Sequence, residues 1–265
     1  MMALRLPREF GLVNWLGLRT HIGKEVQRFL KVGLQTLAAP VITSLMFLVI
    51  FSLALGRSVQ EIGGVAFMEF LAPGLIMMAI IQNAFNNTVS SVMVSKIQGN
   101  IVDVMLPPLT PGEFMLGFIC GGVVRGVLVA LCVGVAMLFF VDMRLHNIIF
   151  IMLHVICAAG VMSMLGLIIG IWADKFDHQA AISNFIITPL SFLSGTFYSI
   201  ERLPDHWQNL AMINPFFYMI DGFRYGFIGH HDAELGFGLF YVILLNIVLW
   251  FLCYRLVTQG YKLKS

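Results

Sequence analysis

The chain has 265 residues, of which 59% are hydrophobic and only 11% are charged, with a formal net charge of +2. Soluble domains carry about 25% charged residues. This composition, with a mean hydropathy of +0.89, therefore excludes an ordinary soluble enzyme or a nucleic-acid-binding protein and predicts a polytopic membrane protein.

Six stretches are long and apolar enough to cross a bilayer as helices, because a spanning helix needs roughly 20 mostly apolar residues. They are too long for the strands of a membrane barrel, and they lack strict alternation of polar and apolar residues. We therefore predict an all-α, polytopic membrane protein with six transmembrane helices, at about Leu34–Leu55, Phe70–Val94, Phe114–Val141, Asn147–Trp172, Gln179–Ser199 and Leu235–Val257.

The stretch before the first span, WLGLRTHIGKEVQRFLKVGLQ, predicts an amphipathic helix. Its apolar residues recur at helical spacing and charged residues take the rest of the surface: Ile22, Val26, Phe29 and Leu30 against Arg19, Lys24, Glu25, Arg28 and Lys31. Such a helix is suited to lie in the membrane interface. Two roles stay open, a simple anchor and a docking collar for a cytoplasmic subunit.

The same stretch contains GLRTHIGKE, which does not fit a phosphate-binding loop. That motif has a shorter spacing between its glycines and needs Ser or Thr after its Lys, whereas Glu25 follows Lys24 here. We therefore expect no ATP hydrolysis by this chain. We also expect no metal or cofactor to be bound by it.

The first loop after a pair of spans reads SKIQGNIVDVMLPPLTPGEF and is punctuated by Gly99 and by Pro107, Pro108 and Pro111. Residues 100–106 predict one or two helical turns near the interface, with these side chains exposed: Ile101, Val102, Met105 and Leu106. A short apolar helix must bury that surface. The two candidates for covering it are a partner subunit and lipid.

Polar side chains also lie inside the predicted spans. Arg125 is roughly 17 Å from the start of the third span at about 1.5 Å per residue, and it is a structural tie or a contact for an anionic substrate. His154 is alone and is interpreted as a hydrogen-bonded packing residue. A polar stripe in the second span lines either a helix contact or a pathway: Gln82, Asn83, Asn86, Asn87 and Ser90.

The residue patterns typical of several other classes of membrane protein are absent from this sequence. The predicted spans contain no Asp or Glu, which argues against a proton- or sodium-coupled carrier, where buried acids usually relay the ion. No channel filter motif is present, nor the residue spacing of an intramembrane metalloprotease. The Cys residues lie inside apolar runs without a CxxC spacing and are interpreted as packing residues: Cys120, Cys132, Cys157 and Cys253.

Residues 197–223, FYSIERLPDHWQNLAMINPFFYMIDGF, are too polar to cross a bilayer and too apolar for a solvated loop. Pro204 and Pro215 can each start or break a short helix. The aromatic side chains suit the membrane interface, and the charged ones could pair across the ends of the segment: Trp207, Phe216, Phe217 and Tyr218, and Glu201, Arg202, Asp221 and Arg224. We predict short re-entrant helices forming an external gate; the alternative is a membrane-hugging loop without a gating role.

The distribution of basic residues orients the chain, because Lys and Arg concentrate on the cytoplasmic side of membrane proteins. An even number of spans places both termini on one side. That side holds most of the basic residues, and the other holds few: Arg5, Arg8, Arg19, Lys24, Arg28, Lys31, Lys96, Lys175, Arg255, Lys262 and Lys264 against Arg57, Arg144, Arg202 and Arg224. Both termini are therefore predicted to be cytoplasmic, and the segment 197–223 external.

Three stretches together resemble the ABC-2 type transporter permeases, the membrane subunits of bacterial ATP-driven exporters. The first is KEVQRFLKVGLQTLAAPVITSLMFLVIFSLALG, an interfacial helix running into a span, and the second is SKIQGNIVDVMLPPLTPGEFMLG, with its Gly, acidic residue and double proline. The third and most specific, LSGTFYSIERLPDHWQNLAMINPFFYMIDGFRYGFIG, looks like the family's signature before the last span. The resemblance covers nearly the whole chain.

The resemblance implies a translocation unit of two permease chains, or two halves, with two docked ATPase subunits that hydrolyse ATP with Mg; for this chain we expect a homodimer. It implies that the N-terminal helix and the first cytoplasmic loop contact the ATPase, through Lys24, Glu25, Arg28, Gly99, Asp103, Met105, Pro107 and Pro108. It also implies an external cap over the pathway, carried by Glu201, Arg202, Pro204, Trp207, Asn214, Pro215 and Arg224.

The chain is thus expected to be one membrane domain. It has a cytoplasmic tail and interface helix at 1–33, a six-helix domain at 34–258 and a cytoplasmic tail at 259–265, with a coupling loop at 95–113 and an external gate at 200–228. We expect an exporter permease in the bacterial inner membrane, in contact with lipid, that moves a hydrophobic, amphipathic or glycan-type substrate. A stand-alone channel or carrier, and a non-transporting scaffold, are the alternatives.

Overall fold

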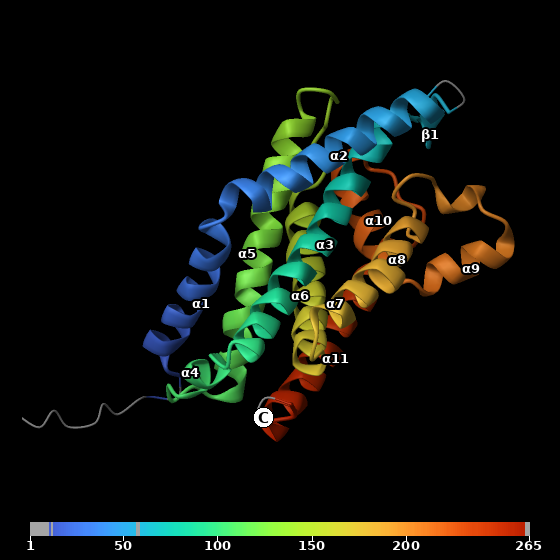
Figure 1. Cartoon of the computed structure of the whole chain (residues 1–265). Helices are drawn as coiled ribbons and strands as arrows, with labels where there is room; N and C mark the ends of the chain where they lie inside the picture. Colours follow the sequence, from blue (N-terminus) through green and yellow to red (C-terminus); the bar gives the residue numbers. More distant parts are fainter. Residues whose placement is uncertain (1–10, 12, 57–58, 263–265) are drawn as a thin grey trace, which may run out of the picture.

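The computed structural model describes residues 11, 13–56 and 59–262, which form a helical bundle with one small hairpin (Figure 1). The outer parts of both predicted tails, and Arg57, lie outside the described residues. The hairpin pairs two antiparallel strands with Glu61 opposite Ala66: β1 (Glu61–Ile62) and β2 (Val65–Ala66). The predicted all-α membrane class is confirmed.

Five helices are long and apolar enough to cross a membrane among the residues described. Each matches a predicted span to within a few residues, because hydropathy is set by the same apolar side chains that must face lipid or protein. They are α2 (Gly33–Leu55), α3 (Phe67–Ile97), α5 (Pro111–Met137), α6 (Ile148–Trp172) and α11 (Leu235–Gln259).

The remaining predicted span, Gln179–Ser199, corresponds to three short helical pieces that follow one another without a gap. They are α7 (Phe176–Ile182), the π-helical η1 (Ser183–Ile187) and α8 (Thr188–Leu193). Pro189 lies in the first turn of α8 and lacks the N–H that would continue the ladder, and a π-turn is one way of accommodating such an interruption. Helix α8 ends at Leu193, short of Ser199, and Gly195 follows in the turn with a φ of +73°, which favours glycine.

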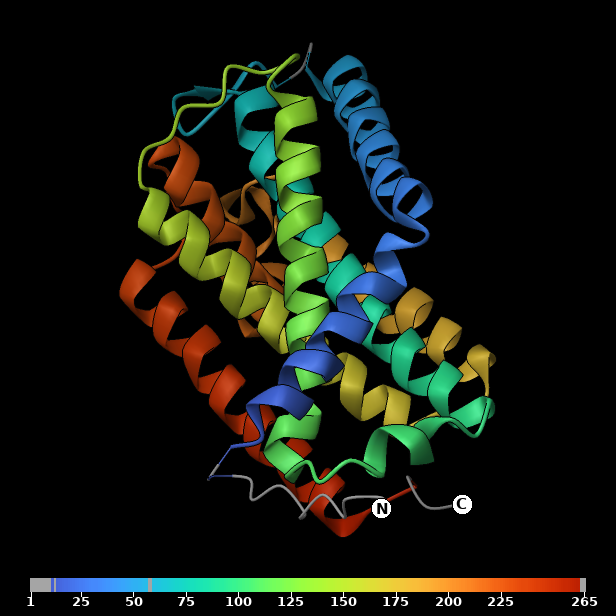
Figure 2. The same ribbon diagram turned by 90° about the vertical axis from the view of Figure 1, so that its left-hand side faces the viewer.

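Helix α3 is the centre of the bundle. In its most apolar stretch 78% of the residues are buried inside the chain, whereas the corresponding values are 11% for α2 and 17% for α11. Small residues of α6 allow the close contact with α3, since Gly166 lies against the backbone of Phe85 and Gly170 against Val92. The outer faces of α2 and α11 are left for lipid or another chain (Figure 2).

The two ends of the molecule carry different elements. One end holds α4 (Ile101–Met105), the start of α1 (Trp15–Leu30) and the end of α11, and the hairpin lies at the opposite end (Figure 1). The segment before the last helix contains η2 (Ile200–Arg202), α9 (Asp205–Ile213) and α10 (Pro215–Ile228). Helix α9 projects from the side of the bundle, while α10 is inserted into it (Figure 1).

Candidate functional site

One carboxylate joins three segments at the α1–α4 end of the bundle. Glu113, in the first turn of α5, accepts the backbone N–H of Asn14 at 2.5 Å and that of Thr110 at 2.6 Å. Asn14 caps α1 by accepting from Gly17 at 3.0 Å, and its amide donates to the carbonyl of Pro108 at 3.2 Å. Thr110 and Glu113 complete a capping box. The starts of α1 and α5 and the end of the loop are therefore held together.

Helix α1 packs along α5 through His21. The His21 ring lies edge-on to Phe118, with ring centres 4.7 Å apart, and its Nε2 is 3.2 Å from the carbonyl oxygen of Phe114. It occupies the space beside Gly117, where any Cβ would overlap the ring. Burial lowers the pKa of His21, so the imidazole is held neutral in this contact.

The face of α1 that packs on the bundle is only partly the apolar face predicted from the sequence. Of that apolar set, Phe29 is buried, Ile22 and Val26 are half-buried and Leu30 is exposed. The other buried residues are Leu18, His21 and Glu25, so a charged residue expected on the surface is buried with polar partners. Hydropathy periodicity therefore predicted the helix and part of its packed face, but not the burial of Glu25.

Glu25 and Arg28 form a tie between α1 and α3. Glu25 is only 1% exposed and accepts from Arg28 at 3.3 Å and from the Ser91 hydroxyl at 2.6 Å. Arg28 also donates to the backbone and side-chain oxygens of Asn87 at 2.8 and 3.0 Å. Of the three α1 residues expected to contact an ATPase, only Lys24 is fully on the surface.

Lys24 shares a groove with the loop residues. The groove has a volume of about 390 Å³ and runs between α1 and α4, and its walls include Lys24, Asp103, Pro107 and Pro108. Gly99 is exposed at the turn before α4, with a φ of +73°, and Met105 is half-buried. The structure thus brings together predicted residues from two segments about 80 positions apart in a single surface.

Helix α4 is anchored on one side and free on the other. Ile101 and Val104 are buried against the bundle, whereas Val102 and Leu106 are 55% and 73% exposed. The expectation that Ile101 is exposed was wrong, because α4 needs an apolar anchor to hold so short a helix. The exposed pair leaves apolar surface at the rim of the molecule.

The polar residues inside the bundle are divided between packing and a small cavity. Asn87 is fully buried, Asn86 and Ser90 are half-buried, and Gln82 and Asn83 line a cavity of about 190 Å³ between α2 and α3. Asn83 accepts from the Nη2 of Arg125 at 3.0 Å, so Arg125 does tie α5 to α3. His154 is 1% exposed with Nδ1 2.8 Å from the carbonyl oxygen of Phe150, in keeping with a packing role.

Arg224 is the centre of the segment before the last helix. Its side chain is fully buried, and the guanidinium donates to the carbonyls of Gly195 at 2.6 Å and Phe70 at 3.3 Å. The guanidinium carbon also lies 3.7 Å from the centre of the Phe70 ring, in a cation–π contact. Arg224 therefore joins α10 to the start of α3 and to the turn after α8.

The expected ion pairs across this segment do not form. Asp221 accepts instead from the backbone N–H groups of Asp232 and Ala233, at 2.8 and 3.1 Å, and Arg202 donates to the carbonyl of Glu61. Asp232 in turn accepts from the N–H of Ile200. Backbone groups of turns, which sequence spacing does not reveal, take the place of the charged partners.

The other predicted gate residues are distributed over α9 and α10. Pro204 precedes α9, and Pro215 is the first residue of α10, as expected of proline at a helix start. Asn214 caps α10 and donates to the carbonyl of Leu190 at 2.7 Å. Trp207 is 53% exposed and Glu201 is exposed. The expectation for Phe216, Phe217 and Tyr218 was wrong: they are buried, since α10 is inserted in the bundle.

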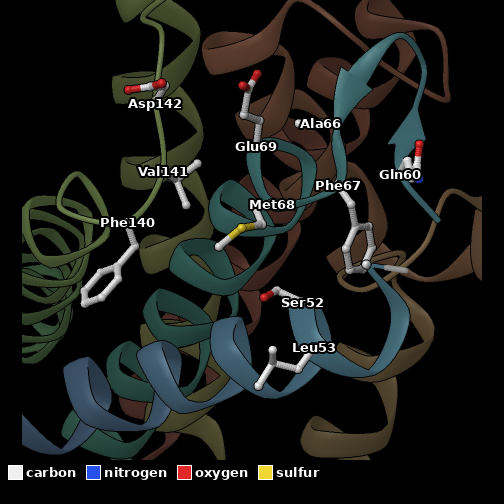
Figure 3. Close-up of a pocket in the computed structure, with 11 residues that line it drawn as sticks. Ser52, Leu53, Gln60, Ala66, Phe67, Met68, Glu69, Phe140, Val141 and Asp142 are labelled. Atoms are coloured by element: carbon white, nitrogen blue, oxygen red, sulfur yellow. The ribbon is translucent and has the colours of Figure 1, made fainter. Parts of the chain in front are cut away.

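A larger cavity of about 470 Å³ opens at the hairpin end. Its walls come from the end of α2, the start of α3 and the residues after α5, and Figure 3 shows Met68 and Ser52 near its floor and Glu69 and Asp142 above them. Both apolar and acidic side chains face it. None of the residues around this cavity was singled out from the sequence.

Sequence reasoning missed Glu113, His21 and Asp232, which make the principal cross-links at the two ends. Only Glu113 had a local signal, because Thr110 and Glu113 have the spacing of a capping box. In the part of the chain that the structure covers, no group of His, Cys, Asp and Glu could hold a metal ion. The four cysteines are free, with Cys253 buried and the others half-buried.

Comparison with known proteins places these features in a family. The family model described as ABC-2 type transporter matches residues 17–228. The inner membrane transport permease YadH of Escherichia coli K12 is 37% identical over 251 residues, which are 95% of this chain and 98% of the relative. Nodulation protein J of Rhizobium leguminosarum bv. trifolii is 25% identical over 230 residues, 85% of each chain. The chain therefore belongs to the ABC-2 type transporter family of membrane permeases.

Proposed function

We propose that this chain is the permease subunit of an ATP-driven exporter and that a separate ATPase docks at the groove between α1 and α4. The observation that carries the proposal is this groove, where Lys24 and Asp103 lie beside Pro107 and Pro108. The exposed Val102 and Leu106 supply an apolar surface next to it. A permease that does not hydrolyse ATP must receive its input through such a contact.

The buried ties explain how a force on this surface would reach the membrane. Helix α4 lies between α3 and α5 in the chain, Glu113 joins the loop to α1 and α5, and Glu25 joins α1 to α3. Closure of an ATPase would therefore move these helices together. Alternating access is then a population shift driven by the different affinities of two ATPase states for two permease states. Glu25 and Arg28 act in this scheme as positioning residues.

We further propose six membrane crossings with both termini in the cytoplasm. The three pieces α7, η1 and α8 have 7, 5 and 6 residues, which is roughly 27 Å at about 1.5 Å per residue and close to the thickness of the hydrocarbon core. The groove at the α1–α4 end is then cytoplasmic. Helices α9 and α10, with the Arg224 contacts, form the external gate, α10 being a re-entrant helix.

The translocation unit in this proposal is a homodimer in a bacterial inner membrane, with two ATPase copies that hold ATP and Mg. The cargo is hydrophobic, amphipathic or glycan-type, and it leaves the cytoplasm. Support comes from the exposed faces of α2 and α11, which a second chain or lipid must cover, and from the names of the relatives, a transport permease and a nodulation protein.

The test is a double variant, Asp103→Ala with Met105→Ala, purified with the ATPase that co-purifies from native membranes and reconstituted in liposomes. We expect the ATPase rate stimulated by this chain to fall severalfold while the yield of folded chain is unchanged. The matched control is Asp142→Ala at the opposite end. If no nucleotide-hydrolysing subunit co-purifies, or if the double variant still stimulates fully, the docking assignment fails, and transport without ATP would identify a stand-alone channel or carrier.

A further inference from the structure

Arg125 carries a positive charge inside the bundle without an acidic partner in the part of the chain that the structure covers. Its Nη2 donates to the neutral amide oxygen of Asn83, and its Nε is buried with no hydrogen-bond partner. No carboxylate oxygen of the described residues is within 4.0 Å of it. A charge at this depth is costly unless a partner or water compensates it.

The neighbouring Arg28 adds to the positive charge of this region. Arg28 is bonded to Asn87, which is one helical turn from Asn83 on α3, so the two guanidinium groups lie along the same side of that helix. The acid of this region, Glu25, is already engaged by Arg28 and Ser91. The amide of Asn87 also has a buried Nδ2 without a partner. The region therefore has unused donors and an excess of positive charge.

A cavity borders this region at Asn83, whereas Arg125 is not one of its wall residues. Asn83 lies in the wall of the cavity of about 190 Å³ between α2 and α3 and at the same time accepts from Arg125. The other wall residues combine polar groups with apolar side chains: Thr43, Ser44 and Gln82 with Phe47, Leu75 and Met78. An anion that replaces the amide oxygen of Asn83 would gain a charge-assisted hydrogen bond.

We propose that Arg125 binds the anionic headgroup of an amphiphile, a phosphate or a carboxylate, which takes the place of the Asn83 amide oxygen, with the apolar chain in the cavity between α2 and α3. The geometry of a guanidinium suits both anions. Two sources share this chemistry, a resident membrane lipid and a transported cargo, and only the second rests on the function proposed above. The exposed outer face of α2 leaves a route from the bilayer.

The experiment measures binding of lysophosphatidic acid and of lysophosphatidylcholine to the purified full chain by native mass spectrometry. We expect the wild type to prefer the anionic lipid by about tenfold, the difference that about 1.4 kcal/mol gives, and Arg125→Gln to lose that preference. Arg125→Lys keeps part of it. The matched control is Arg255→Gln, because Arg255 is exposed on α11 and binds anionic lipid only through general attraction.

A second variant separates binding from a purely structural tie. Asn83→Ala frees the Nη2 of Arg125, so the preference is retained or becomes stronger, whereas a structural tie predicts only a loss of stability similar to that of Arg125→Gln. The proposal is overturned if Arg125→Gln keeps the full preference, or if Arg255→Gln loses as much. Because no ATPase takes part, this result is independent of the docking test.

Two further measurements on the same variants determine whether the anion belongs to a resident lipid or to transported cargo. A phospholipid that co-purifies with the wild type but not with Arg125→Gln identifies a resident lipid. Stimulation of the partner ATPase by added lysophosphatidic acid, absent in Arg125→Gln, identifies cargo. Each result supports the site, and a chain that shows neither retention nor stimulation contradicts it.

Discussion

The two ends of the bundle are both held by a buried charged side chain that binds backbone groups, but the charges are opposite. At the α1–α4 end, the Glu113 carboxylate collects N–H groups at the start of two helices. Near the hairpin end, the Arg224 guanidinium collects carbonyls of α3 and of the turn after α8. The first arrangement leaves a groove open beside it, and the second closes around a helix whose residues are mostly buried. One end therefore has an open groove beside its buried charge, and at the other the buried charge is enclosed with the helix that it holds.

The largest expected effect is a loss of stability near the hairpin end, where Arg224 is buried. Replacing Arg224 by Ala removes two hydrogen bonds to buried carbonyls and the contact with Phe70. We expect a loss of about 3 kcal/mol in the free energy of unfolding, since buried charged networks lose several kcal/mol when one member is removed. The measurement is the melting temperature in detergent, compared with Arg202→Ala, which is exposed. A variant as stable as that control would show that Arg224 does not hold α10.

The next prediction addresses the contact of α1 with α5. Gly117→Ala places a methyl group where the His21 ring lies, whereas Gly112→Ala has nothing within 4 Å of the added carbon. We expect the first variant to lose about 1 to 3 kcal/mol, the usual cost of overpacking, and to lose stimulation of an ATPase as α1 is displaced. Equal stability of the two variants would mean that α1 does not pack on α5 in the membrane.

Variants of two neighbouring residues of α1, Glu25 and Lys24, distinguish a residue that positions the helix from one that contacts the ATPase directly. Glu25→Gln removes the buried charge that binds Arg28 and Ser91, and we expect it to cost about 2 kcal/mol of stability. Lys24→Gln changes an exposed residue of the groove, so stability should stay the same while the concentration of ATPase needed for half-maximal stimulation rises severalfold. The comparison fails if both variants change the same quantity.

The smallest effect is a pH dependence of the α1–α5 contact. Burial lowers the pKa of His21 in the folded chain, and its value in the unfolded chain is about 6.5. The unfolded state therefore binds the proton first as the pH falls below about 6.5, and the folded state loses stability until the pH passes the lowered pKa. Melting temperatures between pH 7.5 and pH 5, chosen on the basis of about 6.5 for a free histidine, should fall more for the wild type than for His21→Gln. Parallel curves would contradict this assignment.

The sequence predicted the membrane class, five apolar helices to within a few residues and short helices near Pro204 and Pro215. These features depend on composition, on run length and on proline, which act locally. It failed for the burial of Glu25 on α1 and for the ion pairs expected of Asp221 and Arg224. In both cases the partners include groups of other segments, which periodicity does not reveal.

The interrupted helix, made of α7, η1 and α8, separates what the local sequence predicts from what only the structure shows. The apolar run predicted one continuous span, whereas the π-turn at η1 and the end of α8 at Leu193 were not predicted from the sequence. The candidate site shows the same division. The sequence named Lys24, Asp103 and the two prolines separately, and their meeting in one groove required the α1–α5 contact.

The sequence by itself determined that this chain is a helical membrane protein of the ABC-2 type family, because hydrophobicity and a set of short motifs are local properties. Tertiary structure alone decided which charges are buried, since Glu25, Glu113 and Arg224 each have at least one partner far away in the chain. It also decided that Arg125 has a neutral partner. The physical reason is that the cost of a buried charge depends on all its neighbours in space, and a short window of sequence contains only some of them.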